Sequence, residues 1–107
     1  MNRGEVRWYT FKAPDKRRPI LILTRDSVLD VLGEVTVAPI TSTIRDIPSE
    51  VVLTREDGMQ RECAINLDHI QTISKGRIGP IVTRLSARQM QKVADALLFA
   101  LGFEGVQ

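Results

Sequence analysis

The stretch DKRRPILIL, residues 15–23, decides how this chain folds, because it joins a cluster of charge to a buried strand. It opens with three cations, Lys16, Arg17 and Arg18, and continues through a proline into the apolar run 20–23. A run without polar alternation cannot turn a polar face to water, so it predicts a strand buried on both faces. Cations fixed beside such a rigid strand indicate a site for an anionic partner.

Segments of strand-forming composition extend from this stretch in both directions. Short runs of β-branched and aromatic residues, bounded by turn signals, predict strands over 4–11, 19–24, 33–41, 49–54 and 62–66, with one or two more over 71–85. The last segment should break near Gly76 or at Gly79–Pro80. The order of these segments favours a mostly antiparallel sheet.

Turn signals separate the predicted strands. We expect a turn in KAPDK, residues 12–16, at Pro14–Asp15. Pro39 should mark the irregular end of its strand, because proline cannot donate to a ladder. Asp57–Gly58 predicts the turn of a hairpin between 49–54 and 62–66.

The period of the apolar residues changes at 86–102, SARQMQKVADALLFALG, which predicts a helix. Ser86 is a natural N-cap, Gln89 would complete a capping box, and Gly102 suits the C-cap. One apolar stripe is expected from Met90, Val93, Ala94, Leu97, Leu98 and Leu101. The predicted fold is therefore mainly β (α+β): a small curled antiparallel sheet or SH3-like barrel, closed by a C-terminal helix.

Composition predicts a single globular domain over 1–107. The chain is 43% hydrophobic and 26% charged, which excludes a disordered chain and allows a core without staples. The net charge of +2 does not by itself indicate a nucleic-acid binder, so the placement of charge matters more.

The lone cysteine, Cys63, favours a reduced, cytoplasmic setting, and we expect it to pack as a small apolar residue. The N-terminal residues lack the apolar core of a signal peptide. No apolar run approaches the ~18 residues that span a membrane, so we expect no membrane partner.

Few residues have a pattern typical of familiar catalytic chemistry. No His or Cys spacing fits a metal site, so no metal and no cofactor are expected. The single histidine, His69, has no Ser and Asp brought to it by any sequence pattern, and we interpret it as structural. Glu56 and Asp57 lie in a turn, where we expect solvated carboxylates.

A second candidate segment is VAPITSTIRD, residues 37–46, where a buried strand ends in three hydroxyls. Thr41, Ser42 and Thr43 can each donate to and accept from phosphate oxygens. The alternative is that they only cap the strand and start a turn, as Ser and Thr often do.

Taken together, these segments resemble the MazF/PemK family of toxin endoribonucleases. RRPILILTRD (17–26) and VTVAPITSTIRDIPSEVVL (35–53) carry the resemblance, with RGEVRW (3–8) and ECAINLDHIQTISKGRIG (62–79) in the same order. RLSARQMQKVADALLFALG (84–102) is similar to the family's closing helix. The likeness covers residues 3–103. The loop 12–16 is shorter than in many family members.

The resemblance implies a sheet of the CcdB/PemK type, a homodimer, and sequence-selective cleavage of single-stranded RNA without metal. It places the catalytic arginine on Arg18 and the catalytic threonine on Thr41. From their charge and hydroxyl chemistry we expect Lys16, Arg17, Ser42 and Thr43 to bind RNA. The resemblance also implies a toxin–antitoxin system, whose antitoxin neutralises the toxin with a disordered acidic tail.

Chemical reasoning agrees with those two roles. Without a metal to activate water, the ribose 2′-OH is the available nucleophile, so the products are a 2′,3′-cyclic phosphate and a 5′-hydroxyl. Arg18 can stabilise the charge that grows on the phosphoryl oxygens, and Thr41 can hold an oxygen in place.

Two other functions remain open on the sequence. A CcdB-like inhibitor of DNA gyrase would share the fold without enzymology, and the Arg18–Thr41 pair argues against it. A plain RNA-binding barrel usually carries an aromatic stacking platform, which the few aromatics here support poorly.

Overall fold

The computed structural model describes residues 1–12 and 16–103. Its strands are β1 (Glu5–Thr10), β2 (Arg17–Ile22), β3 (Glu34–Thr41), β4 (Glu50–Leu53), β5 (Cys63–Asn66), β6 (Gln71–Ser74) and β7 (Ile78–Arg84). Its helices are α1 (Asp26–Leu29) and α2 (Ala87–Leu101), with 3-10 turns η1 (Arg55–Asp57), η2 (Leu67–His69) and η3 (Lys75–Arg77). The predicted Pro14–Asp15 turn lies outside the described residues.

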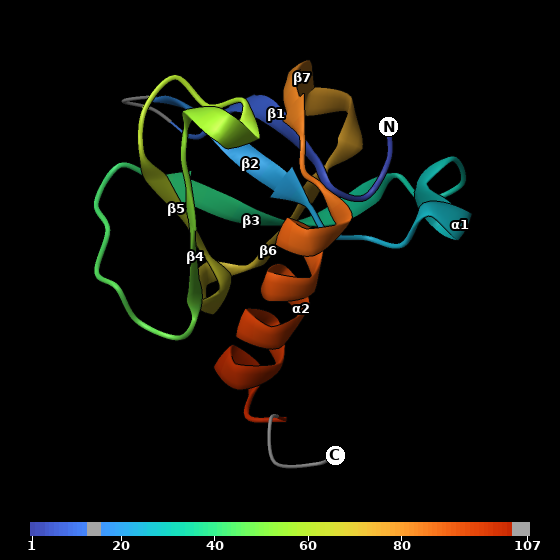
Figure 1. The fold of residues 1–107 in the computed structure, drawn as a ribbon. Coiled ribbons are helices and arrows are strands. Elements are labelled where there is room, and N and C mark those ends of the chain that lie inside the picture. The colour runs from blue at the N-terminus through green and yellow to red at the C-terminus, as the bar shows by residue number, and fades with distance from the viewer. Residues whose placement is uncertain (13–15, 104–107) are drawn as a thin grey trace.

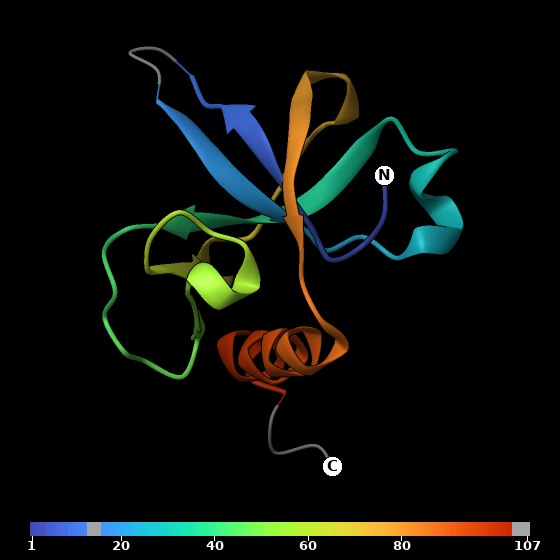
Figure 2. The ribbon, with the colours of Figure 1, turned by 45° about the horizontal axis from the view of Figure 1, so that its top comes forward.

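The strands form one open, curled antiparallel sheet. Their order is β4-β5-β3-β2-β1-β7, and β6 pairs with the first half of β3. Figures 1 and 2 show α2 below this sheet, running past β4, while α1 lies at the opposite end of the molecule from β4 and β5. The predicted curled sheet with a C-terminal helix is thus confirmed. The sheet does not close into a barrel within the described strands.

β2 is buried on both faces, as its apolar run predicted. Ile20 and Ile22 point into a core with Leu29 of α1, whereas Leu21 points into a second core with Val93 of α2. All three β2 residues are fully buried. Because alternate residues of β2 serve both cores, the strand cannot shift without emptying one of them.

The strand predicted over 33–41 is β3, and it is irregular at Pro39, where its pairing changes, without ending there. Pro39 pairs with Ile20 of β2, and the strand then continues for two residues against β5, where Ile40 lies opposite Ile65. On the edge away from β2, β6 pairs with β3 up to Val37 and β5 from Ile40, so the proline is tolerated because its missing N–H falls between these two ladders. Thr41 is the last residue of β3 and pairs with Ala64 of β5.

Helix α2 has the predicted caps but not the full capping box. Ser86 Oγ accepts a hydrogen bond from the Gln89 N–H at 3.1 Å, and Gly102 is left-handed with a φ of 83°. The Gln89 side chain does not return to the N-cap; its Nε2 donates to Asp57 Oδ1 at 2.9 Å. Gln89 is used instead to hold the β4–β5 hairpin.

The buried face of α2 is also narrower than predicted. Val93 and Ala96 are buried, and Met90, Leu97 and Ala100 pack beside them. Leu98 and Leu101 are exposed, because α2 packs mainly against η2 and β4 and these two side chains lie away from that contact. Neither described helix has the length and hydropathy of a membrane span.

Glu5 is a buried acid that the sequence analysis did not single out. It is 1% exposed, and its carboxylate accepts from Arg7 Nε at 2.8 Å. Burial favours the neutral acid, but hydrogen bonding to and charge attraction by Arg7 together leave the Glu5 pKa below its ordinary value. Arg7 in turn donates to the Gly79 carbonyl, which ties β1 to β7 where the β7 register shifts.

Candidate functional site

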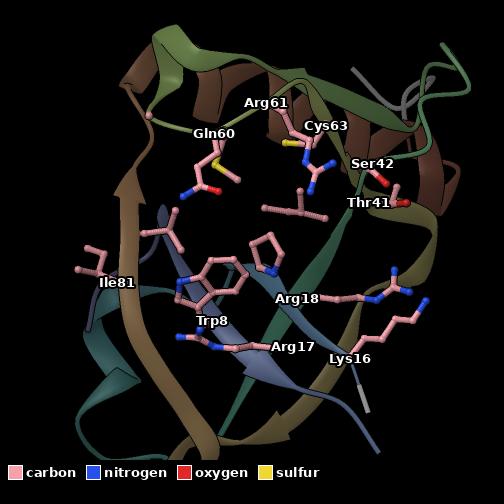
Figure 3. A pocket seen from close by; sticks show the side chains of 15 residues that line it. Trp8, Lys16, Arg17, Arg18, Thr41, Ser42, Gln60, Arg61, Cys63 and Ile81 are labelled. Atoms are coloured by element: carbon pink, nitrogen blue, oxygen red, sulfur yellow. The ribbon is translucent and has the colours of Figure 1, made fainter. Parts of the chain in front are cut away.

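A pocket of about 620 Å³ opens where β1, β2 and β3 meet the β4–β5 hairpin. Figure 3 shows side chains entering it from opposite walls: Trp8 and Arg17 from the sheet, Gln60 and Arg61 from the hairpin. It joins the two candidate segments of the sequence, because Lys16, Arg17, Arg18, Thr41 and Ser42 all line it.

The charge of this pocket is of one sign. Its charged lining residues are Lys16, Arg17, Arg18 and Arg61, and among the described residues that line it none is acidic. Charged walls of one sign around a concave site concentrate the field and raise the local concentration of counter-charged ligand. The geometry therefore suits a polyanion, such as a nucleic-acid backbone.

Arg18 and Thr41 reach the pocket through strand register. β2 and β3 pair Ile22 with Val37 and Ile20 with Pro39. The β2–β3 ladder ends at this last pair, and Arg18 lies two residues before Ile20 while Thr41 lies two residues after Pro39. Both side chains line the same pocket, where one anion can meet them.

The Thr41 hydroxyl is oriented by a local turn. Its Oγ1 accepts a hydrogen bond from the Thr43 N–H at 3.1 Å, so the turn expected as the alternative function of these hydroxyls is present. The same oxygen still has its proton to donate, because the turn uses only its acceptor capacity. Ser42 lines the pocket, whereas Thr43 does not and serves here through its backbone.

Arg17 is placed differently from Arg18. Its guanidinium carbon lies 4.5 Å from the centroid of the Trp8 ring, in a cation–π arrangement. Figure 3 shows Arg17 on one side of the indole, while Arg18 and Lys16 extend toward the end of the pocket where Thr41 and Ser42 lie. The basic run thus supplies two cations for that end and one for an aromatic wall.

The hairpin wall is held by Asp57, which is not a simple solvated carboxylate as predicted. Its Oδ2 accepts from the Thr54 N–H and its Oδ1 from Gln89, both at 2.9 Å. Its backbone carbonyl accepts from Thr83 Oγ1, also at 2.9 Å. Asp57 therefore ties the hairpin to α2 and β7, while Glu56 is exposed.

Three pocket residues were missed by the sequence analysis: Trp8, Gln60 and Arg61. Trp8 is one residue of an ordinary aromatic strand, and Gln60 and Arg61 follow the Asp57–Gly58 turn signal. That signal predicted a tight turn, but the loop is longer: a 3-10 turn precedes a left-handed Gly58. Nothing in the local sequence shows that this loop folds over the start of β2.

Two further expectations concern single residues. Cys63 is buried, as predicted, and lines the pocket. Burial, with a smaller contribution from the Asp57 charge, raises the pKa of its thiol and disfavours the nucleophilic thiolate. His69 is exposed in η2 and does not line the pocket.

We expect Gly58→Ala to lower the free energy of unfolding by about 1–3 kcal/mol, because a side chain there is strained. Gly58 has a φ of 94°, and an added Cβ would lie 2.3 Å from Thr83 Oγ1. Chemical denaturation of the purified variant measures the loss.

Gly33→Ala is the matched control for that measurement. An added Cβ at Gly33 meets no atom within 4 Å, so its stability should stay within about 1 kcal/mol of wild type. Equal losses in the two variants would show that the hairpin is not strained at Gly58.

The chain is similar to known proteins over nearly its whole length. Residues 2–101 match the family described as the PemK-like, MazF-like toxin of type II toxin-antitoxin systems. A probable endoribonuclease, MazF2, of Mycobacterium tuberculosis is 36% identical over 103 residues, which are 95% of this chain and 99% of that relative.

Solved structures give the same result. The Mycobacterium tuberculosis toxin MazF-mt6 superposes with a TM-score of 0.84 at 34% identity, covering 92% of this chain and 96% of that one. A mycobacterial endoribonuclease in complex with its cognate antitoxin superposes with a TM-score of 0.82 at 27% identity, covering 95% of both chains.

Proposed function

This chain belongs to the PemK-like, MazF-like toxins of type II toxin–antitoxin systems, and we propose that it is an endoribonuclease that cleaves single-stranded RNA sequence-selectively. The observation that carries the proposal is the cationic pocket that both Arg18 and Thr41 line. The names of similar proteins, a probable endoribonuclease and a toxin, support the same activity.

The reaction we propose uses the substrate's own nucleophile. The ribose 2′-oxygen bonds to the adjacent phosphorus and loses its proton, while the bond from phosphorus to the 5′-oxygen breaks and that oxygen gains a proton. The products are a 2′,3′-cyclic phosphate and a 5′-hydroxyl.

Arg18 and Thr41 have separate roles in this reaction. Arg18 donates charge-assisted hydrogen bonds to the phosphoryl oxygens, where negative charge grows in the transition state. Thr41, whose oxygen is already held by the Thr43 N–H, donates its hydroxyl proton to one oxygen and fixes the phosphate in place.

The same pocket supports a reaction that needs no metal. A divalent cation would be repelled by the four cations that line it, and these cations can themselves neutralise the phosphate. Lys16 and Arg61, both exposed at the pocket, are placed to hold the flanking RNA backbone, with Ser42 as a hydroxyl partner.

We also propose two protein partners. The cationic pocket suits the acidic, disordered tail of an antitoxin, which would compete with RNA for the same charges. A mycobacterial relative of the same fold has been solved with its cognate antitoxin, which supports such a partner. The second partner is another copy of the chain, in a homodimer.

Incubation of the purified protein with a long RNA in EDTA tests this function directly. We expect cleavage to persist in EDTA, because the cations of the pocket stabilise the transition state in place of a metal. Cleavage should occur at a limited set of sites, because the proposed activity is sequence-selective. End mapping should find 5′-hydroxyl ends, which polynucleotide kinase labels without prior dephosphorylation.

Two outcomes would oppose the proposal. Inhibition by EDTA that Mg²⁺ reverses would indicate a metal-dependent reaction. Intact RNA under all conditions, together with inhibition of DNA gyrase, would instead support the CcdB-like alternative.

A further inference from the structure

Trp8 has no part in the phosphate chemistry, yet it lies in the pocket wall. Its indole is half-buried and lines the same pocket as Arg18. A large aromatic ring exposed in a concave cationic site is unusual, because aromatic surface is favourably buried. Base-stacking platforms on single-stranded nucleic acid combine these two elements, an aromatic face and a cationic groove.

The ring is held rigidly by its surroundings. Trp8 lies in the middle of β1, between β2 and β7, and pairs with Pro19. The Arg17 guanidinium lies over one face of the ring, with its central carbon 4.5 Å from the ring centroid. A ring fixed in this way loses little conformational freedom when a ligand stacks on it.

Trp8 lines the same pocket as Arg18, where we propose that the reacting phosphate binds. Its partner on β2, Pro19, directly follows Arg18, and Arg18 itself pairs with Tyr9. Successive side chains alternate between the two faces of a strand, so Trp8 and Arg18 leave the β1–β2 ladder on opposite faces, yet both line the same pocket. A nucleotide with its phosphate at Arg18 can place its base at Trp8.

The opposite wall offers a group that can read the edge of a base. Figure 3 shows Gln60 reaching into the pocket from the hairpin, across from Trp8. Its amide has both donors and an acceptor. Its backbone carbonyl accepts from Arg55 Nε at 3.1 Å, and Asp57 anchors the same hairpin, so the amide comes from a fixed position.

We infer that Trp8 and Gln60 form a nucleobase-binding subsite next to the scissile phosphate, with Trp8 as the stacking platform and Gln60 as the reader of the base edge. This inference rests on the proposed RNA cleavage and deepens it, because it assigns part of the sequence selectivity to two residues. The sequence supported an aromatic stacking platform poorly, and the structure offers a single ring, Trp8, in the lining of the pocket.

Trp8 is the only tryptophan in the chain, so its fluorescence reports on this subsite alone. The probes are short 2′-O-methyl oligoribonucleotides, which lack the nucleophile and stay intact. The matched control is an abasic oligonucleotide of equal length, which carries the same backbone charge. We expect the base-containing probe to quench Trp8 emission and the abasic probe to bind without quenching it.

Two substitutions at Trp8 separate stacking from folding. Trp8→Phe keeps an aromatic face, whereas Trp8→Leu keeps only apolar volume. Binding of labelled probes, followed by anisotropy, should weaken by about 5- to 160-fold in Trp8→Leu, the equivalent of one stacked base, and less in Trp8→Phe. Abasic-probe binding should be unchanged in both variants, which also shows that they are folded.

Gln60→Ala tests the reader of the base edge. We expect it to reduce the difference in affinity among probes of A, C and U, while Gln91→Ala, an exposed change on α2, leaves that difference as in wild type. An unaltered preference in Gln60→Ala would overturn the role of Gln60.

The outcomes distinguish the subsite from the activity. A wild-type protein that cleaves RNA, but whose Trp8→Leu variant binds base-containing and abasic probes as wild type does, would overturn the subsite and leave the proposed function standing. A wild-type protein that neither cleaves RNA nor binds any probe would overturn both.

Discussion

Arg18→Ala is expected to lower the rate of RNA cleavage by about 100-fold or more, the usual effect of removing one donor from a developing oxyanion. Arg18 is exposed near the start of β2 and lines the pocket, while Ile20 and the two residues after it are fully buried. The substitution therefore removes the charge without disturbing either core. Single-turnover cleavage of an end-labelled RNA, with thermal melting as a check on folding, measures the effect.

Matched variants show whether the loss of cleavage in Arg18→Ala comes from the place of this arginine in the pocket or only from the loss of one positive charge. Arg88→Ala removes an exposed arginine from the first turn of α2, outside the pocket, and should cleave as wild type. Arg18→Lys should recover only part of the rate, because a point charge lacks the guanidinium fork. Thr41→Ala should be impaired as well. If Arg18→Ala and Thr41→Ala both cut at nearly the wild-type rate, the site is elsewhere.

A substrate with 2′-deoxyribose on the 5′ side of the scissile phosphate is expected to bind and to resist cutting entirely. The proposed reaction takes its nucleophile from that one hydroxyl, and Arg18 and Thr41 act on the phosphate and supply no replacement. Binding persists because the contacts of Lys16, Arg17 and Arg61 need no 2′-OH.

The control for this experiment is a substrate with one deoxyribose at a distant position, which should be cut normally. Binding of both substrates should weaken as salt rises, since the pocket cations displace counterions from the backbone. Cutting of the first substrate at the normal rate would show that water or another group attacks the phosphorus, and the proposed mechanism would be wrong.

The parts of the fold that follow from local pattern were predictable from the sequence. The apolar run of β2 required burial on both faces, and Ser86 and Gly102 bounded α2 as expected. The irregularity of β3 at Pro39 has a different cause. Proline chemistry gives the missing donor, but only the three-dimensional pairing shows that one edge of β3 passes from β6 to β5 around Pro39. The short helix α1 was missed, as it covers only four residues.

The candidate site was predictable where its residues adjoin β2 and β3, and not where they come from the hairpin. Arg18 and Thr41 end strands whose pairing could be guessed, so their meeting was expected. Gln60 and Arg61 depend on the path of a loop held by Asp57, through contacts with residues of α2 and β7 that are distant in the chain. Such contacts leave no periodic signal in sequence.

The one-sided charge of the pocket also affects how the protein meets its ligand. Four cations converge there in a chain with a net charge of +2, so the charged groups elsewhere sum to a net negative value. Such a molecule has an electric dipole with its positive end at the pocket. Beyond the ~8 Å over which physiological salt screens charge, collisions are random, but within that range the dipole exerts a torque on the approaching pair. A polyanion that approaches another face is weakly repelled. The torque then turns the two molecules until the cationic pocket faces the polyanion.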